Sequence, residues 1–416
     1  MLCISSRCQN CIRRRKIQID EGVLVNTYLL VRNEKCIFLT VLICPKNDQI
    51  RVVVAGKKPP PVGGQNLLIA ELIKDLQKDE KFQVEHLDFS FTKDWKNARK
   101  LNFSKIFELL NVWNSIRRIS RSGKVDLLLF PVGGPQKVPL IRDTLLLPLI
   151  RPYCRKLVLH FHAAGYARIY GNLFTLLRGF SKSAYSLADE AIVMTCFGSE
   201  DAVYAGVKKI HVCPNVIVDT YAPTKLKTEI RNSIPRILYL GHVYEEKGVF
   251  DLLNALQKVK SHFRLRIVGD CLTPWTPKKL LDWIAEKGLS NSVEYVGCVN
   301  LSKRDDELLK ADFLVFPSRA HESFGLVLAE AMMWKLPIVT FDWRGNKEVV
   351  GENPGGVIMP FGDNVTQLAS AVEYVLKNRD IWLQWGEINR ERFLQKFRKP
   401  EGRPPLADLL LQIASS

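Results

Sequence analysis

Short apolar segments alternate with longer helical stretches along most of this chain of 416 residues, and this alternation constrains its fold more than any other feature. The first series of apolar segments lies at residues 51–55, 82–88, 125–130, 157–161 and 190–195. The second series starts at Ile237 and continues at residues 265–268, 293–296, 313–316 and 337–341. Strands that alternate with helices are typical of a doubly wound, largely parallel α/β sheet. We therefore expect two Rossmann-like domains that bind ligands beyond the carboxyl ends of their strands.

The two series are separated by residues 216–234, which are polar and lack periodicity, as is typical of a linker. We expect an N-terminal domain over residues 48–222, a C-terminal domain over 223–378 and a helical tail over 379–416. Residues 1–47 do not share the alternating pattern. They carry a basic cluster ahead of an apolar stretch, but no signal peptide with a long hydrophobic region and a cleavage site. We interpret them as an N-terminal extension whose role the sequence does not indicate.

The composition is that of a soluble globular protein, with 47% apolar and 25% charged residues. No apolar run approaches the 18 or more residues that a membrane-spanning helix needs. The ten Cys are scattered along the chain, which favours reduced thiols and a cytoplasmic location over disulfides. Cys8 and Cys11 lie two residues apart with Cys3 nearby, but no second pair with zinc-ligand spacing follows. The sequence therefore predicts neither a metal nor a cofactor.

The formal net charge of +17 calls for an anionic partner. No nucleic-acid recognition motif is present, so we do not expect nucleic acid. Residues 96–124 interleave basic and apolar side chains, a pattern typical of a basic amphipathic helix on an anionic membrane surface. The same pattern fits a solvated helix whose apolar face belongs to the core, and the sequence favours neither interpretation. The positive charge would also attract a nucleotide diphosphate.

Two glutamates, Glu322 and Glu330, frame the start of a helical stretch that follows the apolar segment 313–316. The free N–H groups at a helix N-terminus form a site for phosphate oxygens. Glu322 stands at this N-terminus and Glu330 lies two turns further along, about 12 Å on the helix axis. One carboxylate could accept hydrogen bonds from sugar hydroxyls and the other from a ribose. An acidic first turn that stabilises the helix dipole is the structural alternative.

The residues around these glutamates resemble the Glu-x7-Glu region of retaining glycosyltransferases of family 4. The resemblance spans about residues 48 to 400 and rests on several ordered motifs: Pro317-Ser318, Phe324-Gly325-Leu326, Ala329-Glu330-Ala331-Met332, residues 336–340 and 345–350, Gly355-Gly356-Val357 with Pro360, Glu246-Lys247-Gly248-Val249 after residues 237–241, and Asp189, Pro214-Asn215 and Asp219. It implies the GT-B fold, in which two Rossmann-like domains face each other across a cleft. It also implies that a C-terminal helix crosses back to the first domain. We expect residues 379–398 to do so, rather than 406–413.

The resemblance implies roles for the residues after the first strand of the second domain. Lys247 would neutralise the donor diphosphate, because a departing phosphate needs a fixed cation in a water-poor site. The family usually carries an Arg after Gly241, where this chain has His242. A neutral His is a weaker partner for phosphate than an Arg, and Arg266, Arg319 or Arg344 could compensate. In the first domain, Gly63 and Gly64 resemble the family's flexible glycine loop near the diphosphate and acceptor.

Further roles follow from the same resemblance. His162, at the end of a strand on which His160 alternates with it, would meet the donor sugar and shape the catalytic centre. Glu322 would bind donor-sugar hydroxyls, and Glu330 would bind the ribose. The remaining donor contacts would come from the loop before the helix and from the strand near the nucleotide base: Ser323, Phe324, Gly325, Leu326 and Val296. Glu348 is a candidate supporting residue.

Taken together, the resemblance implies a metal-independent retaining glycosyltransferase that moves a hexosyl group from a nucleotide-diphosphate sugar. We expect a glycan or lipid-linked acceptor in cell-surface polysaccharide or lipopolysaccharide assembly. The basic surface is consistent with a cytoplasmic protein held at the inner face of the membrane. Two alternatives stay open: a soluble synthase of a small glycoside or disaccharide, and a catalytically silent homologue that only binds a nucleotide sugar. The donor, whether a UDP, GDP or ADP sugar, is left open as well.

Overall fold

The computed structural model describes residues 14–19, 23–32, 35–43, 49–59, 64–88, 104–221 and 233–416. It divides into two units, residues 1–50 and 51–416. No helix among these described residues is both long enough and apolar enough to cross a lipid bilayer. Cys3, Cys8, Cys11 and Gly63 lie outside the described ranges, as do residues 89–103 of the basic amphipathic segment.

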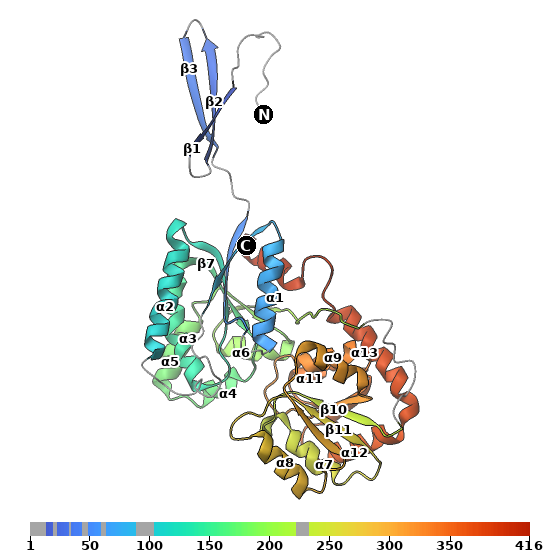
Figure 1. Ribbon diagram of the computed structural model, residues 1–416. Helices are drawn as coiled ribbons and strands as arrows, with labels where there is room; N and C mark the ends of the chain where they lie inside the picture. Colours follow the sequence, from blue (N-terminus) through green and yellow to red (C-terminus); the bar gives the residue numbers. More distant parts are fainter. Residues whose placement is uncertain are drawn as a thin grey trace. The chain divides into compact units, whose positions relative to one another are not determined.

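The first unit contains a three-stranded antiparallel sheet in the order β1-β2-β3, formed by β1 (Arg14–Ile19), β2 (Val23–Arg32) and β3 (Lys35–Ile43). Strand β2 pairs with β3 over its length, from Leu24 opposite Ile43 to Arg32 opposite Lys35. Both strands are rich in Val, Ile, Leu and Thr, residues that fit a pleated surface. The extension that the sequence left without a predicted structure is therefore a β-meander (Figure 1).

The first half of the second unit is a six-stranded sheet in the order β5-β4-β6-β7-β8-β9. The predicted parallel pairing is confirmed from β4 to β9. Its strands are β4 (Ile50–Ala55), β5 (Phe82–Leu87), β6 (Val125–Pro131), β7 (Cys154–Phe161), β8 (Glu190–Val193) and β9 (Lys209–Val212). Its helices are α1 (Gly64–Lys78), α2 (Ser104–Ile119), α3 (Lys137–Ile150), α4 (Tyr166–Gly171), α5 (Thr175–Tyr185) and α6 (Ser199–Tyr204).

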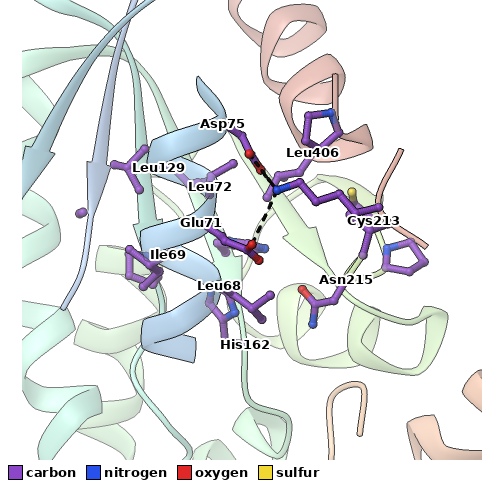
Figure 2. Close-up of a pocket in the computed structure, with 18 residues that line it drawn as sticks. Leu68, Ile69, Glu71, Leu72, Asp75, Leu129, His162, Cys213, Asn215 and Leu406 are labelled. Atoms are coloured by element: carbon purple, nitrogen blue, oxygen red, sulfur yellow. Dashed lines mark hydrogen bonds and ion pairs between the residues drawn. The ribbon is translucent and has the colours of Figure 1, made fainter. Parts of the chain in front are cut away.

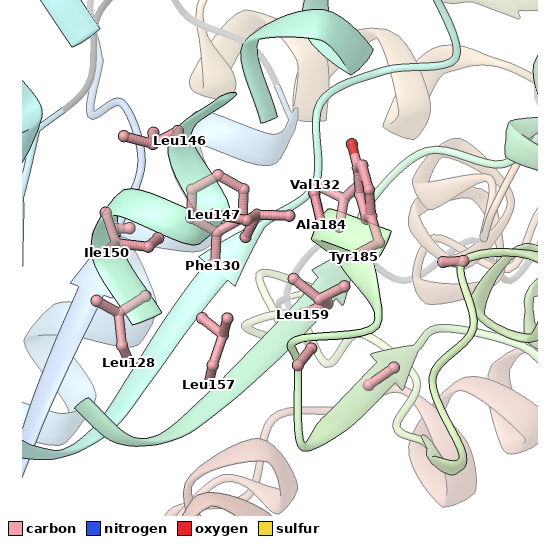
Figure 3. Packing of buried hydrophobic residues seen from close by; sticks show 14 of the residues in the cluster. Leu128, Phe130, Val132, Leu146, Leu147, Ile150, Leu157, Leu159, Ala184 and Tyr185 are labelled. Atoms are coloured by element: carbon pink, nitrogen blue, oxygen red, sulfur yellow. The ribbon is translucent and has the colours of Figure 1, made fainter. Parts of the chain in front are cut away.

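Both faces of this sheet are buried, because helices cover each side. On one face, Leu128 and Phe130 of β6 pack against Leu147 and Ile150 of α3 and against Tyr185 of α5 (Figure 3). On the other face, the alternate residues of the same strands point towards α1. Side chains of successive strand residues point to opposite faces, so the continuous apolar runs in the sequence match a sheet buried on both sides.

The apolar face of α2 contributes to this core. Val112 and Ile116 are fully buried, and Leu109 and Trp113 pack against them. In the described part of the basic amphipathic segment, most of the apolar face therefore belongs to the protein core, which is one of the two interpretations of this segment. Phe107 and Leu110 depart from it, because they lie on the exposed side of the helix.

The second half of the unit is a second six-stranded parallel sheet in the order β12-β11-β10-β13-β14-β15. Its strands are β10 (Arg236–Leu240), β11 (Arg264–Val268), β12 (Val293–Gly297), β13 (Phe313–Phe316), β14 (Ile338–Asp342) and β15 (Gly356–Pro360). Its helices are α7 (Val249–Leu256), α8 (Pro277–Glu286), α9 (Leu301–Lys310), α10 (Leu326–Met333), α11 (Gly345–Val350) and α12 (Asn364–Lys377). From β10 the chain builds outward to β11 and β12, and it then returns to place β13 on the other side. The strand order thus reverses between β10 and β13, where open α/β sheets bind their ligands.

The chain crosses between the two sheets twice, and the expected crossing helix was wrong. Helix α13 (Trp382–Lys396) packs against α10 in the C-terminal domain, because its Phe393 is buried in the same cluster as the α10 side chains. Helix α14 (Pro405–Ser415) instead packs on α1 and β6 of the N-terminal domain. The two crossing segments run side by side, since Ile217 donates to the carbonyl of Phe397 (2.8 Å) and accepts from Lys399 (2.8 Å).

A buried amide holds α13 on the C-terminal sheet. Asn389 accepts from the Gly355 N–H (3.0 Å) and donates to the carbonyls of Leu336 (2.7 Å) and Gly355 (2.8 Å). We expect Asn389→Ala to lower the free energy of unfolding by about 2–4 kcal/mol, because it leaves buried backbone groups unpaired. Urea denaturation measures this loss. Asn378→Ala is the control, because Asn378 makes a single exposed bond to Tyr374 (2.7 Å); equal losses in the two variants would contradict the account.

Candidate active site

The loops after β10 and β13 meet at the switch point of the C-terminal sheet, and a glycine permits their close approach. Gly248 ends the short helix Glu245–Lys247 and begins α7, with a φ of +73°. A Cβ at this position would lie 1.9 Å from the Pro317 carbonyl oxygen. Only glycine tolerates both that φ and that contact. The close approach sets Lys247, just before the glycine, beside the loop that carries Glu322.

Lys247 and Glu322 form an ion pair across these two loops. Ser318 joins them, because its hydroxyl donates to Glu322 Oε1 at 2.8 Å. The side chains of Lys247 and Glu322 are only 18% and 15% exposed. Burial alone would lower the pKa of Lys247, but the Glu322 carboxylate and Tyr244 outweigh that effect and raise it above its usual value. Lys247 is thus a fixed cation in a poorly hydrated site, the state that a diphosphate leaving group requires.

Glu330 lies in α10 and pairs with Arg304 of α9, with 2.5 Å between Oε1 and Nη1. Arg304 also contacts Asp305 at 2.9 Å. Burial raises the pKa of the Glu330 carboxyl, and Arg304 opposes that shift. Arg304 therefore favours the ionised form of Glu330, which can only accept hydrogen bonds. Nothing in the sequence pointed to Arg304, which lies in a helix crowded with charges.

His162 follows β7 on the N-terminal side, and its backbone carbonyl accepts a hydrogen bond from the Ser323 hydroxyl at 2.6 Å. Its ring lies 4.0 Å from that of the buried His160. Burial lowers the pKa of His162 to about 4. Its Nε2 is buried and has no hydrogen-bond partner among the described residues. The neutral ring is therefore free to donate to, or accept from, a ligand at this position.

His162 faces a hollow between the N-terminal sheet, α1 and the two crossing segments (Figure 2). The hollow encloses about 670 Å³, open solvent at its mouth included. Leu68 and Leu72 of α1 and Leu129 of β6 line it, and Asn215 lies opposite them on the first crossing segment. Its rim is closed by Lys399, which pairs with Asp75 at 2.7 Å and lies 3.8 Å from Glu71.

The two domains are joined beside the Lys247–Glu322 pair. Thr195 of the N-terminal domain donates to the Ser323 carbonyl at 2.9 Å. Glu348 accepts from the backbone N–H groups of Cys196 (2.7 Å) and Phe197 (3.3 Å). The loop before α10 is thus held from both domains. The sequence points to Glu348 as a supporting residue. It does not reveal Thr195, whose partner Ser323 lies 128 residues away, and it contains Ser318 within a motif without predicting its bond to Glu322.

His242 stands where the family usually has an Arg. Its Nδ1 is buried and has no hydrogen-bond partner in the described part of the chain. Burial and the neighbouring Lys247 lower the pKa of His242, so that the ring is neutral at pH 7. The three arginines considered as replacements are all engaged with carboxylates: Arg266 with Glu307 and Glu294, Arg319 with Asp251, and Arg344 with Glu200.

The remaining predicted donor residues surround the N-terminus of α10. Gly325 precedes the helix with a φ of +67°, and a Cβ on Gly64 would lie 3.1 Å from Leu326 Cδ1. The N-termini of α1 and α10 therefore approach each other. Phe324 is 2% exposed and packs edge-on against Phe397, so its ring belongs to the core and only its backbone faces the site. Val296 of β12 packs against the same core cluster.

The histidines make stability depend on pH. Because burial keeps His162 neutral, its contribution is full above about pH 6.5 and is lost as the pH falls towards 4. Between pH 7 and pH 5 we expect wild type to lose about 2 kcal/mol more unfolding free energy than His162→Gln. Urea denaturation at both pH values measures this difference. The exposed His262→Gln should follow wild type, and a His162→Gln protein with the wild-type pH dependence would overturn the assignment.

The sequence around this site matches known proteins. Residues 224–392 match the family described as glycosyl transferases group 1. The C-terminal domain belongs to that family. Among curated relatives, an uncharacterized 41.2 kDa protein in the cps region of Klebsiella pneumoniae is 28% identical over 178 residues, which cover 42% of this chain and 46% of that protein. A D-inositol 3-phosphate glycosyltransferase of Xylanimonas cellulosilytica is 30% identical over 188 residues, or 41% of this chain and 45% of that enzyme.

The chain spans less than half the length of these curated relatives. Solved structures extend the likeness to both domains. The superposition with a sucrose-phosphate synthase from Thermosynechococcus elongatus covers 88% of this chain and 100% of the synthase chain, with a TM-score of 0.70 and 16% identity. The Anabaena protein HepE, solved with UDP and glucose, covers 88% of this chain and 99% of its own, with a TM-score of 0.61 and 17% identity. The predicted fold is confirmed: residues 51–416 have the GT-B fold.

Proposed function

We propose that this protein is a retaining, metal-independent glycosyltransferase that moves a hexosyl group from a nucleotide-diphosphate sugar to a glycan or lipid-linked acceptor. One observation carries the proposal: the Lys247–Glu322 pair, with Ser318, lies at the strand-order reversal of a group 1 domain. The relative in a cps region and the complex of HepE with UDP and glucose support the setting and the donor class. We place the reaction in cell-surface polysaccharide or lipopolysaccharide assembly, on the cytoplasmic side of the membrane.

In this proposal the residues 223–378 hold the donor. Lys247 exchanges its pairing with Glu322 for the donor diphosphate and stabilises the charge that develops as the diphosphate leaves. Glu322, released from Lys247, accepts from the sugar hydroxyls. The N-terminus of α10, with the backbone of Phe324, Gly325 and Leu326, receives phosphate oxygens. Glu330, whose charge Arg304 partly stabilises, binds the ribose, and Val296 borders the base.

Residues 48–222 hold the acceptor. His162 contributes a neutral imidazole at the junction of the two domains, where it can contact a hydroxyl of the donor sugar. The Ser323 hydroxyl ties the His162 carbonyl to the loop that bears Glu322. A movement of either the loop or the end of β7 would therefore displace the other. Retention of configuration requires the acceptor to approach from the face that the diphosphate leaves. Lys247 and the helix N-terminus would supply the positive charge that a metal provides in other transferases.

The test is a transfer assay with a panel of UDP, GDP and ADP sugars, run with and without lipid-linked and soluble acceptors. Release of the nucleoside diphosphate that depends on a glycan or lipid-linked acceptor supports the proposal. The coupling constant of the new anomeric proton, measured by NMR, then reports retention or inversion. Release with a small soluble acceptor alone would favour the synthase. Binding without release under any condition would favour the silent homologue, and an inverted product would contradict the retaining mechanism.

A further inference from the structure

Arg319 lies in the loop that carries Glu322 and is bonded to the loop that carries Lys247. Its backbone N–H donates to the Glu246 carbonyl at 2.7 Å. Its guanidinium donates through Nη2 to the Glu245 carbonyl at 3.1 Å. The main chain and the side chain of one residue thus hold the two residues that directly precede Lys247. Arg319 therefore joins the two loops whose side chains form the ion pair of the candidate site.

The same guanidinium also contacts the helix that follows Lys247. Its Nε lies 3.0 Å from Oδ2 of Asp251, in the first turn of α7. Burial raises the pKa of the Asp251 carboxyl, and Arg319 opposes that shift, so the contact favours the ionised carboxylate. One planar guanidinium thus contacts both sides of Gly248, the Glu245 carbonyl before it and the Asp251 carboxylate after it. This arrangement holds the turn around Lys247 at both of its ends.

The bonds of Arg319 do not use the side chain of Lys247. In the proposed reaction Lys247 leaves Glu322 for the donor diphosphate, so the ion pair no longer holds the two loops together at that stage. The bonds of Arg319 use backbone groups and the Asp251 carboxylate, and none of these has a part in binding the donor. They therefore keep the two loops in register when the ion pair is broken.

We propose that Arg319 is a positioning residue, which fixes the turn of Lys247 against the loop of Glu322 and acts on the donor only through Lys247. The family's usual Arg is replaced by His242 in this chain. Arg319 compensates for that loss indirectly, because it holds the remaining cation in place and does not contact the diphosphate itself. The inference rests on the proposed function, since it takes Lys247 as the cation that binds the diphosphate.

The first test needs no donor. Urea denaturation compares the unfolding free energies of wild type, Arg319→Gln, Lys247→Gln and the double variant. Without Arg319 the turn of Lys247 is no longer held against Glu322, so Lys247→Gln should cost less in the Arg319→Gln background than in wild type. Arg319→Lys replaces Arg319→Gln in this cycle if the latter does not fold. Circular dichroism shows whether each variant is folded.

The matched control combines Arg151→Gln with Lys247→Gln, and here the two losses should add. Arg151 also pairs with a carboxylate, Asp189, at 3.1 Å, and it also donates to backbone carbonyls. Its side chain is 29% exposed, against 36% for Arg319. Arg151 lies just before β7, at the opposite end of that strand from the candidate site.

The second test is the transfer assay on the same variants. Arg319→Gln should lower kcat/KM for the nucleotide sugar by about 10- to 100-fold, because a displacement of Lys247 by about 1 Å is enough for such a loss. The double variant should be no less active than Lys247→Gln alone, since Arg319 acts through Lys247. Arg319→Lys should lose nearly as much as Arg319→Gln, because an ammonium lacks the planar fork. Arg151→Gln should stay within about threefold of wild type.

Four results would overturn the proposal. Additive losses of unfolding free energy for Arg319→Gln and Lys247→Gln would show that the two residues are not coupled. A double variant whose loss of kcat/KM is the product of the single losses would show that Arg319 acts independently of Lys247. Full activity of Arg319→Lys would make the charge alone sufficient, and equal activity of Arg319→Gln and Arg151→Gln would leave Arg319 a purely structural role. An inactive wild type would contradict the proposed function instead, because the unfolding measurement still decides whether Arg319 positions Lys247.

Discussion

Lys247→Gln is expected to lower kcat/KM for the nucleotide sugar by about 100- to 1,000-fold, the cost of removing one preorganised charge from a developing oxyanion. The reason lies in the pair itself. Lys247 is mostly buried and Glu322 holds its charge in place, so solvent would screen it little from a bound diphosphate. Release of nucleoside diphosphate, measured at low donor concentration, reports the loss directly.

Lys335→Gln is a close control for this substitution. Lys335 also pairs with a glutamate, Glu387, in the same domain, and its side chain is 15% exposed against 18% for Lys247. We expect its kcat/KM to stay within about threefold of wild type. Glu322→Gln should be nearly as inactive as Lys247→Gln, and the double variant little worse than either, because residues that act as a unit are not additive. Equal activity of Lys247→Gln and Lys335→Gln would contradict the role of Lys247.

Gly248→Ala is expected to reduce both stability and activity more than any other single methyl addition at the site. An Ala at a φ of +73° costs about 1–2 kcal/mol by itself. Its Cβ would also lie 1.9 Å from the Pro317 carbonyl oxygen and 2.8 Å from the carbonyl carbon, so one of the two loops must move. We expect the total cost in unfolding free energy to exceed about 3 kcal/mol. Displacing the Glu322 loop by about 1 Å should lower kcat by about 100-fold.

Gly288→Ala separates the backbone cost of the positive φ from the steric cost of the added Cβ. Gly288 has a φ of +68°, but nothing lies within 4 Å of the Cβ that Ala would add. This control should therefore show the backbone cost of about 1–2 kcal/mol and full activity. Chemical denaturation and the transfer assay on both variants measure the comparison. If Gly248→Ala is as active as Gly288→Ala, the close approach of the two loops does not position the site.

The sequence predicted most strands because parallel strands buried on both faces are continuous apolar runs. It missed the edge strands β9 and β15, whose residues are mostly half-buried or exposed. It missed β1 to β3 as well, since their apolar stretches were not assigned to strands. The crossing helix was misassigned because α13 and α14 both bury residues spaced along one side of the helix. Which domain each helix joins depends on contacts such as those of Asn389, and these are not visible in periodicity.

For the site, the sequence pointed to Lys247, Glu322 and Glu330 through local motifs. It could not show that Lys247 and Glu322 form a pair, because 75 residues separate them and their contact depends on the order of β10 and β13. The same reason hid Thr195 and Arg304, whose partners Ser323 and Glu330 come from elements brought together by folding. Ser318 lies only four residues from Glu322, but the motif that contains it assigned it no role. The roles of these residues stay predictions, and each is open to the substitutions described above.

The most direct measurement is thermal stabilisation of the protein by nucleoside diphosphates and their sugars, compared between wild type, Glu330→Ala and Glu373→Ala. Glu373 lies on α12 and accepts from the backbone of Lys260 and Ser261, so it controls for removing a partnered carboxylate away from the site. One nucleotide should stabilise wild type by about 2.7 kcal/mol at 100 times its dissociation constant. Glu373→Ala should respond equally and Glu330→Ala much less. Absence of a shift with every nucleotide, or an undiminished shift in Glu330→Ala, would contradict the proposed donor site.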